Sequence, residues 1–356
     1  MNSDRTAKAH SSAPAAGARN RERCVRGFPD RRVPVSITGR GSVRSDMNPT
    51  GRSTFRCAES PAAIIRVALP IVLCLCFALP ACGAGRPECR SVPSRILARA
   101  VAYCVLLPPS YDLAKTRRYP VVYFLHGLGQ NEQALLDSGG WNLIQDLWDQ
   151  KQIGEFLIVA PDGGRSFFIN SRDGGQRYED FFMKEFLPFI ESHYRLSAGR
   201  RNRGISGVSM GGYGALHLAL GHPELFGSVS AHSAALINKL PQGNLDSASA
   251  QAISRALGGA FGTPFDRAFW ERNSPFTLAR NGPRPTGLRI YFDCGTEDDF
   301  GFNRGAQAFD DLLVSRKIPH EFHLYPGRHD LGYFAEHLPE SFEFQSRAFG
   351  LTAVGK

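Results

Sequence analysis

Apolar runs of strand length alternate with amphipathic stretches of helix length over most of the chain after residue 100. Uninterrupted apolar runs at 119–125 and 156–160 are typical of strands buried on both faces of a parallel sheet. Strands are also expected at 203–206, 226–231, 288–293 and 321–325, and helices at 141–150, 181–194, 215–220 and 305–317, followed by closing helices. Pro188 predicts a kink or local break in the second helix. Strands alternating with helices predict an α/β fold, with a mostly parallel sheet and helices on both faces. The stretch 234–286 is less regular.

Two segments before this region alternate as strands of a hairpin, 89–94 and 100–107. A tight turn centred at Ile96 and Leu97 would place Cys89 directly opposite Cys104. An oxidising compartment would permit a disulfide there. Two buried free thiols are the alternative, because the register is inferred only from the pattern.

Residues 1–46 lack apolar periodicity and are rich in Arg, Ser, Ala, Gly and Pro, so no fold is expected there. A second methionine, Met47, is followed by three arginines and the apolar run 67–79. This run is shorter than the roughly 20 residues that span a bilayer, so residues 47–82 are interpreted as an export signal. Met47 is then the candidate start, with residues 1–46 an upstream extension.

The signal ends at 79–83, which resembles a bacterial lipobox with Cys82 as the lipid-bearing cysteine, although Pro80 departs from the usual pattern. Lipid modification and ordinary signal cleavage both remain open. Either one predicts an exported protein that is periplasmic, extracellular or anchored at the cell envelope through Cys82. Residues 83–356 then form the folded domain.

Charge is concentrated at the N-terminus. The net charge is +9, but residues 1–66 hold 13 Lys and Arg against 5 Asp and Glu, which leaves 29 against 28 for the rest. A nearly neutral folded part argues against a nucleic-acid partner. The Cys and His spacings do not resemble a zinc site, so no metal is expected.

The motif Gly207-Val-Ser-Met-Gly211 lies between an expected strand and an expected helix. This places Ser209 on a strand-to-helix corner, the nucleophile elbow of hydrolases. Glycines on both sides avoid collisions with the neighbouring strand and helix. The helix N-terminus would point N–H groups at a developing oxyanion.

An acid and a histidine follow Ser209, each just past an expected strand end: Asp298 and His329. The order Ser, Asp, His is the chain order of the α/β-hydrolase fold. His329 would act as the base and Asp298 would orient it. Their rivals are Asp293, Asp299, His320, His323 and His337, read as loop-capping, packed or exposed groups.

Two backbone N–H groups are best placed for the oxyanion, those of Leu128 and Met210. His126 is expected to brace the Leu128 loop, and His217 to be packed against neighbours. The glycine-rich segments 162–166 and 171–175 lack phosphate-loop spacing and are read as loops bordering the pocket.

Four motifs together carry a family resemblance: His126-Gly-Leu-Gly129, Gly207-Val-Ser-Met-Gly-Gly-Tyr-Gly-Ala-Leu216, Cys294-Gly-Thr-Glu-Asp298 and Gly327-Arg-His-Asp330. Over about residues 90 to 350 the chain resembles the esterase family that includes esterase D (S-formylglutathione hydrolase), feruloyl and tributyrin esterases, and secreted mycolyltransferases. The resemblance implies an α/β-hydrolase fold without a cofactor. It also implies Ser209 as nucleophile, Asp298 as acid, His329 as base, and oxyanion amides at Leu128 and Met210.

These patterns predict an exported serine carboxylesterase acting on a small-molecule or polysaccharide-linked ester with a small or aromatic acyl group. The alternatives are an acyltransferase to a sugar or lipid hydroxyl, a thioesterase similar to S-formylglutathione hydrolase, and a surface binding protein on a hydrolase scaffold. Phe167, Phe168 and Trp270 are candidate pocket walls, although core packing is the simpler role for each. The oligomeric state is left open by the sequence.

Overall fold

The computed structural model describes residues 84–239 and 256–351. The predicted upstream extension 1–46, the export signal 47–82 and the lipid site Cys82 therefore lie outside the described residues. None of the described helices combines the length and apolar character that a membrane span requires.

Within the described residues, eight strands form one sheet in the order β1-β2-β4-β3-β5-β6-β7-β8. The strands are β1 (Arg86–Ser94), β2 (Arg99–Leu107), β3 (Val121–Leu125), β4 (Leu157–Pro161), β5 (Arg203–Val208), β6 (Ser228–His232), β7 (Arg289–Gly295) and β8 (Glu321–Tyr325). All neighbours from β4 to β8 pair in parallel, whereas β1 with β2 and β2 with β4 are antiparallel. The mostly parallel α/β sheet expected from the sequence is confirmed.

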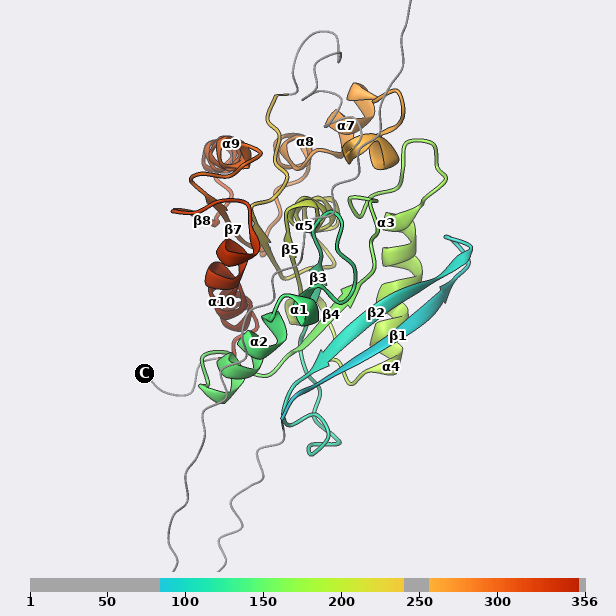
Figure 1. Cartoon of the computed structure of the whole chain (residues 1–356), viewed down its shortest axis with the longest axis vertical. Helices are drawn as coiled ribbons and strands as arrows, with labels where there is room; N and C mark the ends of the chain where they lie inside the picture. The colour runs from blue at the N-terminus through green and yellow to red at the C-terminus, as the bar shows by residue number, and fades with distance from the viewer. Residues whose placement is uncertain (1–83, 240–255, 352–356) are drawn as a thin grey trace, which may run out of the picture. The chain divides into compact units, whose positions relative to one another are not determined.

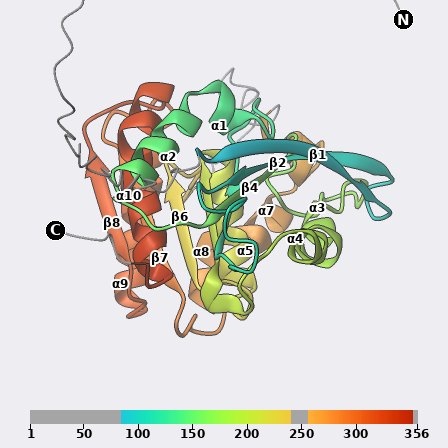
Figure 2. The ribbon, with the colours of Figure 1, turned by 90° about the horizontal axis from the view of Figure 1, so that it is seen from below.

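Helical segments connect these strands (Figure 1). They are α1 (Ala134–Asp137), α2 (Gly140–Asp149), α3 (Tyr178–Phe181), the π-helical turn η1 (Phe182–Phe186), α4 (Leu187–His193), the 3-10 turn η2 (Arg200–Asn202), α5 (Met210–Gly221), α7 (Arg267–Asn273), α8 (Pro275–Asn281), α9 (Phe302–Ser315) and α10 (Leu331–Ala348). Figure 2 shows α2 and α5 on opposite faces of the sheet.

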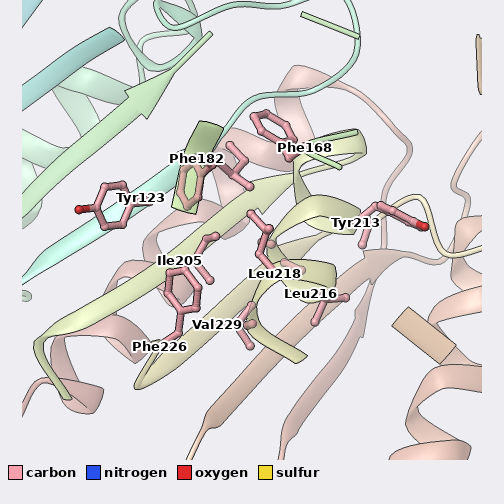
Figure 3. Close-up of a cluster of buried hydrophobic side chains, with 14 of the residues drawn as sticks. Tyr123, Phe168, Phe182, Ile205, Tyr213, Leu216, Leu218, Phe226 and Val229 are labelled. Atoms are coloured by element: carbon pink, nitrogen blue, oxygen red, sulfur yellow. The ribbon is translucent and has the colours of Figure 1, made fainter. Parts of the chain in front are cut away.

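The two faces of the sheet carry separate apolar cores. On one face, Ile144 of α2 and Phe342 of α10 pack against sheet residues such as Val122. The larger core on the other face collects side chains from α3 to α5, α8 and α9. Figure 3 shows part of it, where Leu218 of α5 lies beside Ile205 of β5. Every residue of α5 from Met210 to Leu220 is buried, as expected for a helix that is apolar all round.

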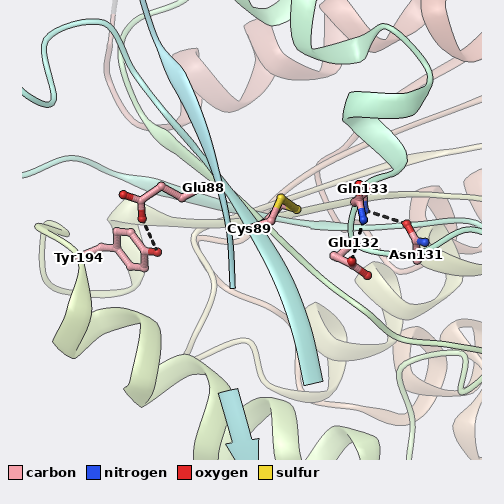
Figure 4. The surroundings of a disulfide bond; sticks show 7 residues. Glu88, Cys89, Asn131, Glu132, Gln133 and Tyr194 are labelled. Carbon is pink, nitrogen blue, oxygen red and sulfur yellow. Dashed lines mark hydrogen bonds between the residues drawn. A yellow bond between two sulfur atoms is a disulfide. The ribbon is translucent and has the colours of Figure 1, made fainter. Parts of the chain in front are cut away.

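The N-terminal hairpin is closed by a disulfide between Cys89 and Cys104, which face each other in the β1–β2 register. This confirms the predicted register and selects the disulfide over two free thiols. The hairpin runs beside α4 in both views of the ribbon. The hydroxyl of Tyr194, at the end of α4, donates to Glu88 over 3.3 Å (Figure 4).

The local break that Pro188 predicted in the expected helix 181–194 is present. The helix is divided into α3, η1 and α4, with Pro188 in the first turn of α4. A proline is tolerated there because its missing N–H would have no partner within the new helix. The expected closing helices are the single helix α10, which continues through Pro339.

The irregular stretch 234–286 contains more helix than its pattern indicated. Residues 256–261 are helical, and α7 and α8 follow. Residues 240–255 lie outside the described part.

Candidate active site

Ser209 lies at the corner between β5 and α5, with φ of 54° and ψ of −114°. Its backbone N–H donates to the carbonyl oxygen of His232 at the end of β6, over 2.9 Å. The following turn leaves no room for side chains. A Cβ atom added at Gly211 would lie 1.9 Å from the carbonyl oxygen of Leu125, and one at Gly207 would lie 2.3 Å from that of Gly211. These contacts explain the glycines of the motif, since the strained serine conformation needs close backbone packing to persist.

The structure brings together the three side chains expected at this site. The Nε2 atom of His329 lies 2.9 Å from the hydroxyl oxygen of Ser209. The Nδ1 atom of the same ring lies 2.6 Å from Oδ2 of Asp298. Ser209, Asp298 and His329 follow β5, β7 and β8, whose carboxyl ends meet at one edge of the sheet. The resulting chain of hydrogen bonds can move a proton from the hydroxyl to the imidazole.

The carboxylate of Asp298 is held by several donors. The backbone N–H groups of Phe300 and Phe302 donate to Oδ1 over 3.0 and 3.1 Å. The buried thiol of Cys294 lies 3.6 Å from Oδ2. Burial raises the pKa of Asp298, but the hydrogen bond from His329, the charge of that ring and the two backbone amides outweigh it, so its pKa is lowered from its ordinary value. Asp298 is therefore kept as an anion that faces the imidazole.

Three aromatic rings surround the imidazole of His329. The ring centroids of Phe300, Phe302 and Phe334 lie 4.8, 5.4 and 5.4 Å from its own, each in an edge arrangement. Its side chain is only 8% exposed. The rings restrict its rotation and keep water from its bond to Asp298.

The loop after β3 lies directly beside the serine. A Cβ atom added at Gly127 would be 3.7 Å from the Cβ of Ser209. This loop forms a turn in which Gln130 N–H donates to Gly127 over 3.2 Å, and the side chain of Gln130 accepts from Gly127 N–H over 2.9 Å. Leu128 lies within that turn and Met210 begins α5. The two expected oxyanion amides thus belong to segments on either side of Ser209.

His126 braces this loop, as expected. Its Nδ1 lies 2.8 Å from the carbonyl oxygen of Gly127, and its Nε2 accepts from the N–H of Gly163 over 2.9 Å. His217 is also packed, with Nδ1 2.8 Å from the carbonyl oxygen of Asn273.

The rival acids and histidines are occupied elsewhere. Asp299 pairs with Arg328 and accepts from the backbone of His329, so it supports the base without contacting its ring. His320 pairs with Asp310, His323 is exposed on β8, and His337 is buried against the ring of Tyr325. Asp293 pairs with His232 instead of His329, and both side chains of this pair are buried.

A buried cluster below the serine was missed by sequence reasoning. The Nδ1 atom of His232 lies 2.7 Å from Oδ2 of Asp293, and the hydroxyl of Tyr333 donates to Oδ1 over 2.7 Å. Because Tyr333 lies in the first turn of α10, four residues after His329, this bond links the histidine loop to β7. The available signal was the position of His232 at the end of the strand next to the elbow.

The candidate pocket walls are core residues. Phe167, Phe168 and Trp270 are 3%, 0% and 6% exposed, and Phe167 packs edge-on against Tyr213. Among the described residues, no group of three His, Cys, Asp or Glu side chains is arranged to hold a metal ion.

Comparison with known proteins places this geometry in a family. The family described as "Putative esterase" matches residues 94–344. Two Mycobacterium tuberculosis proteins, Esterase MT1326 and Esterase Rv1288, are each 32% identical over 249 residues, covering 63% of this chain. The chain spans about half (51%) of the length of these two relatives.

Two further relatives are matched over most of their own length. The S-formylglutathione hydrolase of Bos taurus is 27% identical over 65% of this chain and 83% of that protein. A solved structure of a ferulic acid esterase is 27% identical, with a TM-score of 0.64 over 75% of this chain and 100% of that one. Its likeness confirms the expected α/β-hydrolase fold. The family match covers most of the chain and includes all four motifs, so this chain belongs to the esterase family.

Proposed function

We propose that this protein is a serine carboxylesterase that hydrolyses esters through an acyl-enzyme on Ser209. The observation that carries the proposal is the hydrogen-bonded chain from Ser209 through His329 to Asp298. A serine hydroxyl is a weak nucleophile near neutral pH and needs a base aligned in this way. Membership of the esterase family supports the same reaction.

The reaction divides into two steps. In the first, Ser209 Oγ attacks the ester carbonyl while His329 Nε2 takes the hydroxyl proton. The C–O bond to the alcohol then breaks, and the alcohol leaves with that proton. In the second step water gives a proton to His329 and its oxygen attacks the acyl-enzyme, which releases the acid and returns the proton to Ser209. Asp298 stabilises the imidazolium formed in each step.

The tetrahedral oxygen would be bound by the N–H groups of Leu128 and Met210. Donors fixed before the reaction stabilise the developing charge without reorganising, and one such donor is worth about 3 kcal/mol of barrier. The turn at Gly127 and the N-terminus of α5 supply this rigidity.

For the substrate we propose a small-molecule or polysaccharide-linked ester with a small or aromatic acyl group. The names of two relatives, a ferulic acid esterase and an S-formylglutathione hydrolase, support this range.

We further propose that the protein is exported and that Cys82 is lipid-modified. The short apolar run before Cys82 supports export. The Cys89–Cys104 disulfide supports it as well, because such bonds persist in oxidising compartments. Labelling cells with radioactive palmitate should mark the wild type and not Cys82→Ser. A wild type that takes up no label would refute lipid modification at Cys82. Detection of protein that contains residues upstream of Met47 would refute Met47 as the start.

The test of the activity is hydrolysis of p-nitrophenyl esters, a feruloyl ester and S-formylglutathione by the wild type and by Ser209→Ala. We expect Ser209→Ala to lose at least about a thousandfold in kcat. Ser192→Ala, an exposed serine on α4, is the matched control and should retain full activity. Activity that survives Ser209→Ala would refute the mechanism. Adding sugar or glycerol acceptors to the same assay separates acyl transfer from hydrolysis.

A further inference from the structure

A cavity of about 110 Å³ lies between α1, α2 and the start of α10, and its lining includes the residue before Ser209 and a ring that packs against His329. We call it the apolar chamber and define it by Leu135, Leu143, Val208, Leu331, Phe334 and Ala335, which all line it. Leu331, two residues after His329, is 57% exposed.

Three residues that line the apolar chamber are close to those that carry the chemistry. Val208 immediately precedes Ser209, and its Cγ2 lies 3.6 Å from the Cβ position of Gly127. The ring of Phe334 packs edge-on against His329. Gln130, another lining residue, holds the N–H of Gly127 in the oxyanion turn. The chamber therefore adjoins the segments that hold Ser209, His329 and the oxyanion turn.

The chemistry of the lining selects an uncharged, apolar group. None of the residues that line the chamber is charged, and its polar side chains are Gln130 and Ser138. The Oε1 atom of Gln130 accepts from Gly127, and the hydroxyl of Ser138 donates to the carbonyl oxygen of Ala134 over 2.6 Å. Because Gln130 Oε1 and the Ser138 hydroxyl proton are used in these hydrogen bonds, a ligand in the chamber would be held mainly by apolar contacts with its CH₂ groups.

The size of the chamber limits what enters. A cavity of about 150 Å³ takes one benzene molecule, so a chamber of 110 Å³ fits a chain of about four carbons better than a substituted aromatic ring. A second hollow of about 210 Å³ shares Gln130, Ala134, Ser138 and Leu331 with the chamber and continues outward past Asn131 and Asp137. A longer chain would reach these polar groups and gain little more.

We propose that the apolar chamber binds an unbranched aliphatic chain of the ester, of up to about four carbons, and so sets the substrate class. This inference rests on the proposed esterase activity and narrows its substrates from esters with small or aromatic groups to short aliphatic esters. The chain can belong to the acyl group or to the alcohol, because the chamber lies between the oxyanion turn and the histidine loop.

The test measures kcat/KM over two series, p-nitrophenyl esters from acetate to octanoate and alkyl acetates from methyl to octyl. In one series, kcat/KM of the wild type should rise by up to about fourfold for each methylene buried. The rise should end when the chain has about four carbons. That series identifies which side of the ester the chamber holds.

Two variants change the chamber in opposite directions. Ala335→Phe fills it from an exposed position of α10, so the gain in kcat/KM with chain length should disappear. Leu143→Ala enlarges it, so the plateau should move to longer chains. Glu336→Phe places the same ring on the next, exposed residue, outside the chamber, and should keep the wild-type profile.

The inference would be overturned if both chamber variants left the dependence of kcat/KM on chain length unchanged in both series. It would also be overturned if the wild type had a higher kcat/KM for the feruloyl ester than for every aliphatic ester. Either result can occur while hydrolysis still depends on Ser209. Activity independent of Ser209 would instead refute the proposed function itself.

Discussion

The imidazole of His329 and the carboxylate of Asp298 are joined by a contact of 2.6 Å between Nδ1 and Oδ2, although they are 31 positions apart in the chain. This contact fixes the ring so that Nδ1 carries the proton and Nε2 faces Ser209. The rival acid Asp299 is next in sequence, but it pairs with Arg328 instead. The orientation of the base therefore depends on one carboxylate.

Asp298→Asn should lower kcat by about a thousandfold or more with a much smaller change in KM. The amide can present an N–H to the imidazole, which favours the tautomer that cannot accept the Ser209 proton. The matched control is Asp311→Asn, an exposed acid on α9, which should retain wild-type kinetics. Steady-state kinetics with a p-nitrophenyl ester test this prediction. A loss of less than about tenfold in kcat would mean that another group orients His329.

Two glycines of α5 should respond in opposite ways to alanine. Gly211→Ala should destabilise the fold by about 3 kcal/mol or more, because the new methyl group would collide with the backbone of Leu125. Gly221→Ala, at the other end of the helix with open space around it, should stabilise by about 0.5 to 1 kcal/mol. Urea unfolding of the two variants tests this. Equal stabilities would mean that the elbow is not closely packed.

Removing the disulfide should cost stability and spare activity. The bond joins residues 15 positions apart, and closing a loop of that size is worth about 3 kcal/mol. The double variant Cys89→Ala, Cys104→Ala should therefore unfold at lower urea concentration, while its kcat at 25 °C stays close to that of the wild type. The hairpin lies at the β1 edge of the sheet and supplies none of the proposed catalytic residues. A dead but folded double variant would contradict this.

A half-buried glutamate, Glu179, predicts a pH-dependent stability. Glu179 lies 2.8 Å from Nε2 of His222 and 3.2 Å from Nε2 of His217. Burial raises the pKa of Glu179, but the hydrogen bonds from the two histidines outweigh it and lower this pKa overall. The hydrogen bond to Glu179 raises the pKa of His222. Glu224 is the other acid near His222, 3.7 Å from its Nδ1.

The sign follows from these directions. A raised histidine pKa adds stability that is complete below about pH 6.5 and is lost as the pH rises through the folded value. A lowered glutamate pKa adds stability above about pH 4.5 that is lost as the pH falls. The stability difference between wild type and Glu179→Gln should thus be largest between about pH 4.5 and 6.5. Thermal unfolding over pH 4 to 9 checks this, with Glu191→Gln as the exposed control. A stability difference between wild type and Glu179→Gln that does not change with pH would contradict the prediction.

The sequence predicted those features that depend on local pattern and strand order. The apolar runs identified the strands, and the positions of Ser209, Asp298 and His329 just past three of them anticipated one shared edge. The hairpin register followed from alternation alone, because a two-residue period leaves little freedom once the turn is centred.

Features that arise from packing between distant segments were not predictable. The π-helical turn at 182–186 has no local signal beyond Pro188, which predicted a kink or local break but not a π-helical turn. The His232–Asp293 contact joins two strands whose pairing becomes known only with the sheet order. The chamber likewise needs α2 and α10 to meet, although 190 residues lie between Gly140 and Leu331.

The most direct test of the central claim is covalent labelling of the wild type with a fluorophosphonate, followed by peptide mass spectrometry. We expect one label per molecule, on the peptide that contains Ser209, and no label on Ser209→Ala. His329→Ala should react far more slowly, since it lacks the base 2.9 Å from the hydroxyl. A label on another residue, or labelling of Ser209→Ala at the wild-type rate, would contradict the assignment of Ser209 as the nucleophile.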